Sequence, residues 1–304
     1  MLDPYEVSNQ LLHHPLWENQ TISITIKRLD MVHPLASGNK FYKLKYNLEA
    51  AKTEKKQCIL TFGGAYSNHI YATAAACQAE GIRAIGIIRG EAHHPLNPTL
   101  HAASAMGMHL EYIDREKYRE KKDPIFHQQL MEKLGDCYVL PEGGTNAFAI
   151  QGTAEILTEN DEDFTHICTA IGTGGTFAGL AKSIKENQTL LGYSSLKGEF
   201  IHQEIKDLLE NHNILPLGNA RVIEDYHFGG YGKIKPELLD FVRWFYKEFN
   251  IPIEPIYTAK MIFGILDQLQ KSEFPKGSKI LILHTGGLQG LAGFNARYGT
   301  SLPL

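Results

Sequence analysis

The stretch Ile-Cys-Thr-Ala-Ile-Gly-Thr-Gly-Gly-Thr-Phe-Ala-Gly-Leu, residues 167–180, runs from a short apolar segment through a glycine turn into apolar residues at helical spacing. This pattern predicts a strand, a tight turn and a helix. Glycines allow backbone N–H groups to converge on an anion, and the following helix adds the positive end of its dipole. The turn therefore fits a phosphate, although the same residues could form a strand-to-helix connection that binds nothing.

Two other apolar runs end in the same way. One passes into Gly63-Gly-Ala-Tyr-Ser67-Asn68, and the other passes into Thr285-Gly286-Gly287. Ligands of open α/β sheets bind at the carboxyl ends of the strands, where such turns gather. Three glycine turns that carry hydroxyl groups therefore predict one shared polar ligand, with a phosphate among its groups.

Short apolar runs alternate with helix-length segments along the whole chain, which predicts an α/β fold built on mostly parallel sheet. Apolar stripes predict helices over residues 41–51, 177–184, 238–249 and 262–269. The expected strands are Ile22–Ile26, Gln57–Phe62, Ile82–Ile88, Leu110–Ile113, Cys137–Leu140, Ile167–Ile171 and Lys279–Leu283.

The turn after Ile171 differs from the common nucleotide loops. No lysine follows its glycines, as the G-x-x-x-x-G-K-[ST] loop requires, and the full G-x-G-x-x-G pattern of dinucleotide sites is missing. A nucleotide is therefore the weaker interpretation of the phosphate site.

Lys40 and Lys43 stand three residues apart after the sequence Ser37-Gly38-Asn39, in which Asn39 is a plausible helix cap. Two ammonium groups at that separation repel each other, which favours a lowered pKa and a neutral amine on one of them. A neutral lysine amine is the species that forms a Schiff base with an aldehyde. The alternative, a solvated basic face, is the usual role of such pairs.

Ser67 stands at a strand-to-helix junction but lacks the G-x-S-x-G spacing of a hydrolase nucleophile. Its simplest role is to cap the helix that follows, with Asn68 and His69 as ordinary polar residues. A catalytic role needs support from elsewhere in the sequence.

The composition is that of a globular protein. The 304 residues are 43% hydrophobic and 21% charged, with a formal net charge of −4, so no general attraction to nucleic acid or anionic lipid is expected. The first residues show neither a basic start nor an apolar run, and no stretch approaches the roughly 18 apolar residues of a membrane span. We expect a soluble cytoplasmic protein.

The four cysteines are far apart and lie in apolar stretches, so we expect all of them to be buried and reduced. The fourteen histidines raise the alternative of a metalloprotein. Two histidine pairs, His13-His14 and His93-His94, are neighbours in sequence, however, and neighbours rarely share one helical face. No H-E-x-x-H motif occurs. We therefore expect no metal site.

Five motifs, in order, resemble those of one family of pyridoxal-phosphate enzymes of fold type II, the 1-aminocyclopropane-1-carboxylate deaminases and D-cysteine desulfhydrases. The resemblance extends from about Ile22 to Leu291. The motifs are Leu35-Ala-Ser-Gly-Asn39-Lys40-Phe-Tyr-Lys43-Leu, similar to G-G-N-K-x-R-K-L; Gly63-Gly-Ala-Tyr-Ser67-Asn68-His69; Gly172-Thr-Gly-Gly-Thr176; Glu254-Pro-Ile-Tyr257-Thr258-Ala-Lys260, similar to D-P-V-Y-T/E-G-K; and His284-Thr285-Gly286-Gly287.

The resemblance implies a role for each matching position. Lys40 would hold pyridoxal phosphate covalently, with Asn39 beside it, and Lys43 would bind the phosphate together with Gly172, Thr173, Gly174, Gly175 and Thr176. Thr285 would meet the pyridine nitrogen. Asn68 would bind the ring hydroxyl or the substrate carboxylate, and Ser67 would be a nucleophile or proton carrier. Tyr231, Tyr257 and His69 would line the substrate side, with the two tyrosines helping to move protons.

The resemblance also implies the architecture. Two open, twisted α/β sheets of the tryptophan synthase β type would enclose the cofactor in the cleft between two domains. The larger domain would comprise residues 1–45 and 150–304, and the smaller would be inserted as residues 46–149. A homodimer is implied as well.

The substrate is less well determined by the motifs. Tyr42, Tyr66 and Tyr71 replace residues that the family usually carries, and the chain is short around Leu191–Gln203. Thr258 stands at the position that glutamate occupies in the deaminase motif Y-E-G-K. A hydroxyl at Thr285 favours an unprotonated ring nitrogen. This combination favours α,β-elimination from a D-amino acid such as D-cysteine, giving pyruvate, ammonia and sulfide. The alternatives are cyclopropane opening to 2-oxobutanoate and ammonia, and a non-catalytic amino-acid-binding relative.

Overall fold

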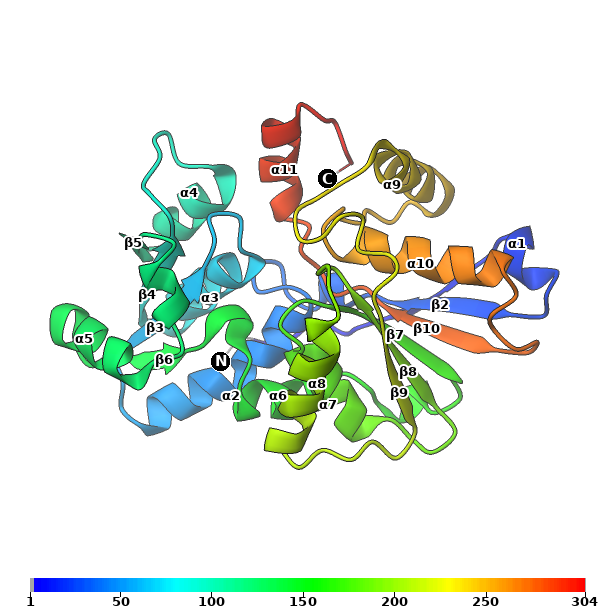
Figure 1. The fold of residues 1–304 in the computed structure, drawn as a ribbon, viewed down its shortest axis with the longest axis horizontal. Coiled ribbons are helices and arrows are strands. Elements are labelled where there is room, and N and C mark those ends of the chain that lie inside the picture. The colour runs from blue at the N-terminus through cyan, green and yellow to red at the C-terminus, as the bar shows by residue number, and fades with distance from the viewer. Residues whose placement is uncertain (1–2, 304) are drawn as a thin grey trace.

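The structure is a computed structural model that describes residues 3–303, and Figure 1 shows its ribbon. Residues 1, 2 and 304, which the expected domain limits include, lie outside that range. The strands are β1 Asn9–Leu12, β2 Ser23–Lys27, β3 Cys58–Gly63, β4 Arg83–Arg89, β5 His109–Ile113, β6 Tyr138–Leu140, β7 His166–Ile171, β8 Thr189–Ser194, β9 Asn219–Ile223 and β10 Lys279–Leu283.

Helices connect most of these strands. The α-helices are α1 Pro15–Glu18, α2 Asn39–Thr53, α3 Asn68–Glu80, α4 Pro98–Ala105, α5 Pro124–Leu134, α6 Ala147–Ala154, α7 Gly175–Ser183, α8 Phe200–Asn211, α9 Pro236–Phe249, α10 Thr258–Gln270 and α11 Gly290–Tyr298. Four 3₁₀ turns join them: η1 Leu29–Met31, η2 Lys117–Glu120, η3 Glu142–Gly144 and η4 Glu159–Asp161.

The larger sheet has the strand order β1-β2-β10-β7-β8-β9. All its pairs are parallel except β1 with β2. Ile282 in the centre pairs with Ile26 on one side and with Cys168 on the other. Helices α7 and α10 both contact β7 and β8, and they lie on opposite faces of the sheet in Figure 1.

The smaller sheet, of order β5-β4-β3-β6, is parallel throughout. Figure 1 shows it on the other side of the molecule from the larger sheet. Its strands fall between residues 58 and 140, inside the segment expected to form the inserted domain. The division of the chain into 1–45 with 150–304 and 46–149 stays a prediction.

All seven expected strands are present, and the glycine turns of β3, β7 and β10 stand at carboxyl ends of parallel strands. Three strands were missed. β1 and β9 are the edges of the larger sheet, where a partly exposed strand need not be apolar. β8 contains Gly192, where a Cβ would lie 2.5 Å from the Phe177 ring, so close packing of α7 explains a residue that is rare in strands.

The expectation of four reduced cysteines is wrong for one pair. Cys58 on β3 and Cys137 just before β6 form a disulfide, whereas Cys77 and Cys168 are free and buried. Ile59 pairs with Tyr138, so the two cysteines lie opposite each other one position earlier in the parallel ladder. Their separation of 79 residues hid this proximity in the sequence.

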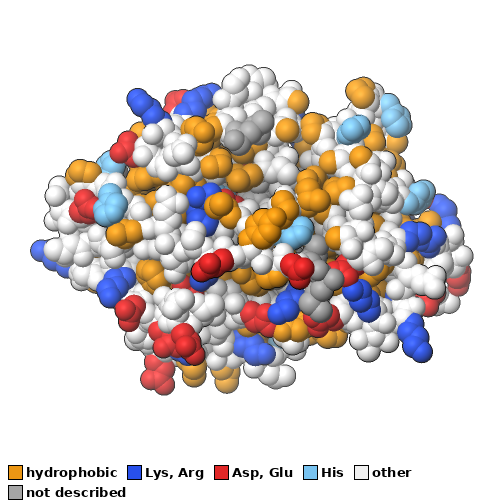
Figure 2. All heavy atoms as spheres, turned by 180° about the vertical axis from the view of Figure 1, so that it is seen from behind, with side chains coloured by type: hydrophobic (Ala, Val, Ile, Leu, Met, Phe, Trp, Pro, Cys, Tyr) orange, Lys and Arg blue, Asp and Glu red, His pale blue; other side chains and the backbone are white. Residues whose placement is uncertain are grey.

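The surface carries no large patch of one charge on the face shown in Figure 2, because acidic and basic side chains intermingle there. In residues 3–303, no helix has both the length and the apolar character needed to cross a membrane.

Candidate functional site

A cavity of about 1380 Å³ opens at the carboxyl ends of the strands and is lined by residues from the elements of both sheets. The residues that the sequence singled out gather in its wall, with Gly175 as the exception. They are Asn39, Lys40, Lys43, Ser67, Asn68, His69, Gly172, Thr173, Gly174, Thr176, Tyr231, Tyr257 and Thr285. The three glycine turns therefore do share one site.

Lys40 lies in the first turn of α2, with its amine directed to its neighbour. Its Nζ is 3.0 Å from Asn39 Oδ1, and Asn39 Nδ2 donates to Thr176 Oγ1 at 2.8 Å. Burial lowers the pKa of Lys40 from 10.5 to about 8, against the opposing charge of Glu254. Lys40 thus has a fixed amine with a substantial neutral fraction near neutral pH.

Lys43 connects the same helix to the glycine turn after β7. Its Nζ donates to the Gly143 carbonyl at 2.9 Å, to Thr145 Oγ1 at 3.1 Å and to Thr173 Oγ1 at 3.3 Å. Burial and the nearby Lys40 charge hold its pKa well below 10.5. No carboxylate of the described chain pairs with Lys43, so an anion bound at the turn would supply its missing counter-charge.

The turn itself is a cradle that side chains would fill. A Cβ on Gly172 would lie 3.0 Å from Tyr257 Cε1, and one on Gly175 would lie 3.1 Å from Lys43 Nζ. Gly174 caps α7 without a side chain, which leaves the first N–H groups of the helix open to the cavity side. A bound phosphate fits this donor set.

Gly38 brings the Lys40 loop against the turn after β10. Asn39 N donates to the Thr285 carbonyl at 3.3 Å, and a Cβ on Gly38 would lie only 2.0 Å from that oxygen. Gly38 also adopts φ +67° and ψ −152°, a conformation that glycine alone adopts readily. This approach sets Thr285 beside the start of α2.

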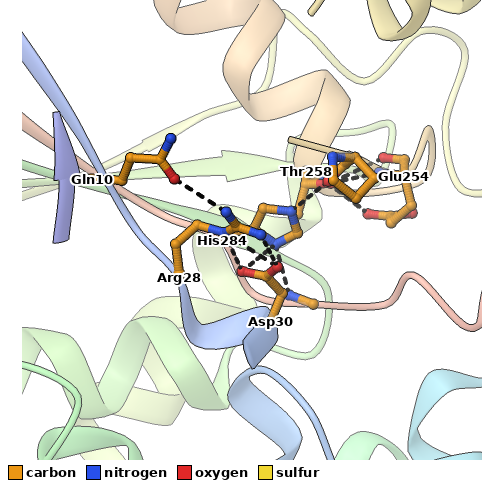
Figure 3. Close-up of polar contacts among 8 residues, drawn as sticks. Gln10, Arg28, Asp30, Glu254, Thr258 and His284 are labelled. Atoms are coloured by element: carbon orange, nitrogen blue, oxygen red, sulfur yellow. Dashed lines mark hydrogen bonds and ion pairs between the residues drawn. The ribbon is translucent and has the colours of Figure 1, made fainter. Parts of the chain in front are cut away.

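His284 fixes the turn from behind, a role that the sequence did not reveal (Figure 3). Its Nε2 is 2.7 Å from the Pro252 carbonyl, so Nε2 carries the proton and Nδ1 accepts from Gly286 N at 3.3 Å. Burial lowers the pKa of His284, which keeps the ring neutral. Asp30, held by Arg28 at 2.8 Å, lies 3.6 Å from Nδ1.

Ser67 and Asn68 begin α3. Ser67 Oγ accepts from Ile70 N at 3.3 Å, so the capping role that the sequence predicted is confirmed. Asn68 Oδ1 accepts from Gln289 Nε2 at 2.6 Å, which leaves the Asn68 amide N–H groups for a ligand. Within residues 3–303, the backbone N–H groups of Asn68 and His69 donate to no protein acceptor.

His69 is buried behind this helix start. Thr61 Oγ1 donates to the Leu140 carbonyl at 2.9 Å, so His69 Nε2, 2.8 Å away, must donate to Thr61. His69 Nδ1 is then a lone-pair acceptor, and it has no partner in the described chain. Burial and the charges of Lys40 and Lys43 hold the His69 pKa well below 6.5, so the ring stays neutral.

Tyr231 and Tyr257 form the opposite part of the wall, with ring centroids 6.0 Å apart. Burial raises the pKa of both hydroxyls, and a hydrogen bond between them lowers the pKa of Tyr231 while raising that of Tyr257. Both hydroxyls remain protonated at neutral pH. The directions of the two shifts make Tyr257 the donor in the bond between them, which leaves the Tyr231 O–H to donate to a ligand.

Glu254 is a carboxylate in the wall that the sequence analysis did not single out as functional. Its carboxylate accepts from the backbone N–H groups of Ile256, Tyr257 and Thr258 at 2.7–2.8 Å and so caps α10. Burial raises its pKa to about 7, against these hydrogen bonds. Thr258 is fully buried and bound to Glu254, as Figure 3 shows.

Lys260, in the first turn of α10, is 2% exposed and holds the loop that leads to Tyr231. Its Nζ donates to the carbonyls of His227 at 2.8 Å and Gly230 at 2.9 Å. Burial lowers its pKa to about 8. The sequence could not predict this contact of Lys260, because its partners are backbone carbonyls some 30 residues away.

The sequence pattern described as "Pyridoxal-phosphate dependent enzyme" matches residues 7–286. The chain belongs to this enzyme family. Pyridoxal phosphate is therefore its cofactor, and the buried Lys40 amine and the phosphate-fitting turn agree with that cofactor.

Individual relatives confirm the resemblance seen in the motifs. A Pyrococcus horikoshii protein provisionally named 1-aminocyclopropane-1-carboxylate deaminase is 30% identical over 88% of this chain and 85% of its own length. The chain is 29% identical to an Arabidopsis thaliana mitochondrial bifunctional D-cysteine desulfhydrase and 1-aminocyclopropane-1-carboxylate deaminase, over 88% of this chain and 72% of that protein.

Solved structures agree on the fold. One described as an ACC deaminase homologue superposes with a TM-score of 0.85 at 27% identity, covering 98% of this chain and 94% of the other. Tomato (Solanum lycopersicum) threonine deaminase, at 18% identity, superposes with a TM-score of 0.66 over 97% of this chain and 84% of its own, and shares the fold alone. The predicted α/β fold of pyridoxal-phosphate fold type II is confirmed.

Proposed function

We propose that the protein catalyses α,β-elimination from a small D-amino acid with a leaving group on Cβ, of which D-cysteine is the leading candidate. D-Cysteine and water would give pyruvate, ammonia and hydrogen sulfide. The observation that carries this proposal is the gathering of the Lys40 amine, the Ser67 and Tyr257 hydroxyls and the Thr285 turn in one cavity. Elimination needs a base that removes the Cα proton and a path for the leaving group. It does not need a nucleophile that attacks a carbon atom of the substrate.

Each part of the cofactor has a candidate partner. Lys40 would hold it covalently, and Lys43 with Gly172–Thr176 would bind its phosphate. Thr285 would meet the pyridine nitrogen and Asn68 the ring hydroxyl or the substrate. When bound, the cofactor draws electrons from Cα and so acidifies the Cα–H bond.

The start of α3 offers a seat for the substrate carboxylate. The free N–H groups of Asn68 and His69 and the positive end of the helix dipole suit an anion. A carboxylate bound there would bring Cα between Ser67 and the amine of Lys40. Lys40, released by the incoming amino group, can then take the Cα proton.

The wall around the proposed ring position is a mixture of hydroxyl and carboxylate. The Thr285 hydroxyl favours an unprotonated ring nitrogen, which suits prompt loss of a β-substituent. Glu254 puts a carboxylate in the same wall, but its oxygens cap α10. We therefore base the preference for elimination on the Thr285 hydroxyl, and not on the lack of a carboxylate in the cavity wall.

Cyclopropane opening is the second candidate. It is favoured by the names of the Pyrococcus horikoshii relative and of the bifunctional Arabidopsis thaliana enzyme. Both substrates would use the same carboxylate seat, but the cyclopropane amino acid has no hydrogen on Cα, so its reaction must break a Cα–Cβ bond of the ring, with a proton or nucleophile delivered to a ring carbon.

A panel of D- and L-amino acids and the cyclopropane amino acid, assayed for 2-oxo acid release, tests the proposal. We expect a higher kcat/KM for D-cysteine than for the cyclopropane substrate. The opposite order would promote the second candidate, and no release from any amino acid would reject both.

A further inference from the structure

Arg89 is a charged residue of the cavity wall to which neither motif nor resemblance gives a role. It is the last residue of β4, at the carboxyl end of the smaller sheet, and it lines the same cavity as Ser67. Its Nη2 lies 3.4 Å from where a Cβ on Gly64 would be, so the guanidinium stands over the turn that leads to Ser67.

The guanidinium has no counter-charge. Arg89 is an exposed residue of the cavity wall, so water reaches its guanidinium. Within residues 3–303, none of its N–H groups donates to a protein acceptor and no carboxylate lies within ion-pair distance. The neighbouring Glu142 is already bound by the Tyr118 hydroxyl at 2.8 Å and by Lys121 Nζ at 3.5 Å. The described contact of Arg89 is with the ring of Tyr118, 5.6 Å from centroid to Cζ.

The Tyr118 contact orients Arg89 without using its donors. Tyr118 is 2% exposed and its hydroxyl is fixed on Glu142, so the ring is a rigid support. Guanidinium is suited to two parallel hydrogen bonds with an oxyanion such as carboxylate or phosphate. Arg89 is therefore a prepared and unused oxyanion receptor.

Arg89 also faces the substrate side of the cavity. Burial raises the pKa of the Tyr231 hydroxyl, and the positive charge of Arg89 opposes that shift while Glu142 adds to it. Arg89 thus lies near the Ser67 turn and lines the same cavity as Tyr231. Because the start of α3 already offers a seat for the α-carboxylate, a second anionic group is what Arg89 is free to bind.

We propose that Arg89 binds an anionic β-substituent, so that the enzyme also accepts three-carbon amino acids whose leaving group is a tetrahedral oxyanion, such as a phosphate or sulfate ester, and prefers them to neutral esters. This inference rests on the proposed elimination. For the phosphate ester, the Cβ–O bond breaks and its electron pair leaves with the phosphate. The Cα proton passes to the protein and returns to Cβ. One water supplies the keto oxygen, and the products are pyruvate, ammonium and hydrogen phosphate.

The test compares O-phosphoserine with O-acetylserine, a neutral ester, as D and L enantiomers, in the wild type and in Arg89→Gln. We expect the wild type to prefer the phosphate ester. Arg89→Gln should lower kcat/KM for the phosphate ester at least tenfold, because it removes charge-assisted hydrogen bonds, and leave kcat/KM for the acetyl ester within threefold. Arg119→Gln removes an equal charge from an exposed position outside the cavity and should change neither substrate.

The outcomes separate this inference from the proposed function. Two results would overturn the role of Arg89 and leave the proposed elimination standing. In the first, the wild type turns over D-cysteine or the acetyl ester but does not prefer the phosphate ester. In the second, Arg89→Gln lowers kcat/KM equally for both esters. An equal fall in kcat/KM would indicate that Arg89 binds the α-carboxylate, which both esters share. If Arg89→Gln does not fold, the salt dependence of the wild type decides: kcat/KM should fall with ionic strength more steeply for the phosphate ester, and equal slopes would reject the inference.

Discussion

Lys40 and Lys43 are both buried and both have a lowered pKa, so either amine could in principle react with an aldehyde. Their contacts distinguish them. Lys43 donates to three oxygens around the phosphate-fitting turn, whereas the one side-chain hydrogen bond of the Lys40 amine in residues 3–303 is to Asn39. Lys40→Ala should lose the covalent cofactor adduct and keep the fold, while Lys43→Ala should keep the adduct and bind free cofactor more weakly.

Mass spectrometry after borohydride reduction locates the adduct, and circular dichroism checks the fold. An adduct found on Lys43 in the wild type would contradict the assignment.

The lowered pKa of Lys40 predicts how cofactor loading depends on pH. The neutral amine is the reactive form, and its fraction rises with pH through the pKa. With a pKa of about 8, about one amine in ten is neutral at pH 7, against about one in three thousand at the ordinary 10.5. The rate of adduct formation in the apoenzyme should therefore rise with pH and level off above about 8 to 9. A rate that keeps rising tenfold per pH unit beyond 9 would show an ordinary lysine.

Gly38 offers a test of the close approach to Thr285. Gly38→Ala adds a Cβ 2.0 Å from the Thr285 carbonyl oxygen and forces alanine into a conformation it avoids. We expect the free energy of unfolding to fall by at least about 3 kcal/mol, with loss of cofactor affinity. Gly81→Ala is the matched control, because φ is +66° and no described atom lies within 4 Å of the added Cβ. It should cost about 1 kcal/mol. If urea titrations gave the same fall in the free energy of unfolding for both variants, the steric clash at Gly38 would be rejected.

At the scale of elements, Lys260 connects α10 to the loop that carries Tyr231. Lys260→Met keeps much of the side-chain volume but leaves the carbonyls of His227 and Gly230 without a donor. We expect kcat to fall about tenfold because Tyr231 loses its fixed position, while borohydride-trapped cofactor stays at the wild-type level. Lys271→Met removes an exposed lysine next to the end of the same helix and should change neither quantity.

An unchanged kcat in Lys260→Met would reduce Lys260 to a purely structural residue. Loss of the trapped cofactor would place its effect on the cofactor and not on Tyr231.

The sequence predicted those elements whose residues carry a local signal. Alternation and glycine turns located the strands at 58–63, 166–171 and 279–283 and hence the shared cavity. The edge strands β1 and β9 gave no such signal, and Gly192 in β8 is explained only by the Phe177 ring that packs on it. In the site, the sequence placed Glu254, Lys260 and His284 in motifs without giving them a role, because their partners are mainly backbone atoms. Arg89 lies outside the motifs and carried no signal.

For the whole molecule, the Cys58–Cys137 disulfide predicts a thiol count. Without reductant, the denatured protein should react with thiol reagent at Cys77 and Cys168 only, and with reductant at all four cysteines. Closing a loop of 79 residues would stabilise the fold by up to about 4.5 kcal/mol. Cys58→Ser should therefore lower Tm, and reductant should lower the wild-type Tm by a similar amount. Four reactive thiols without reductant would show that the bond does not form.

The place of β2 in the larger sheet has a consequence for synthesis on the ribosome. β2 pairs with β10 from Ser23 to Lys27, across more than 250 residues of chain, and its other neighbour is the short edge strand β1. The strands of the smaller sheet are complete once residue 140 has emerged, whereas β2 waits for its partner until translation is nearly finished. The turn after β10 is also what Gly38 rests on. We therefore expect Lys40 to stay exposed to water in the nascent chain until synthesis is nearly finished, and the cofactor to bind in one of the last steps of folding.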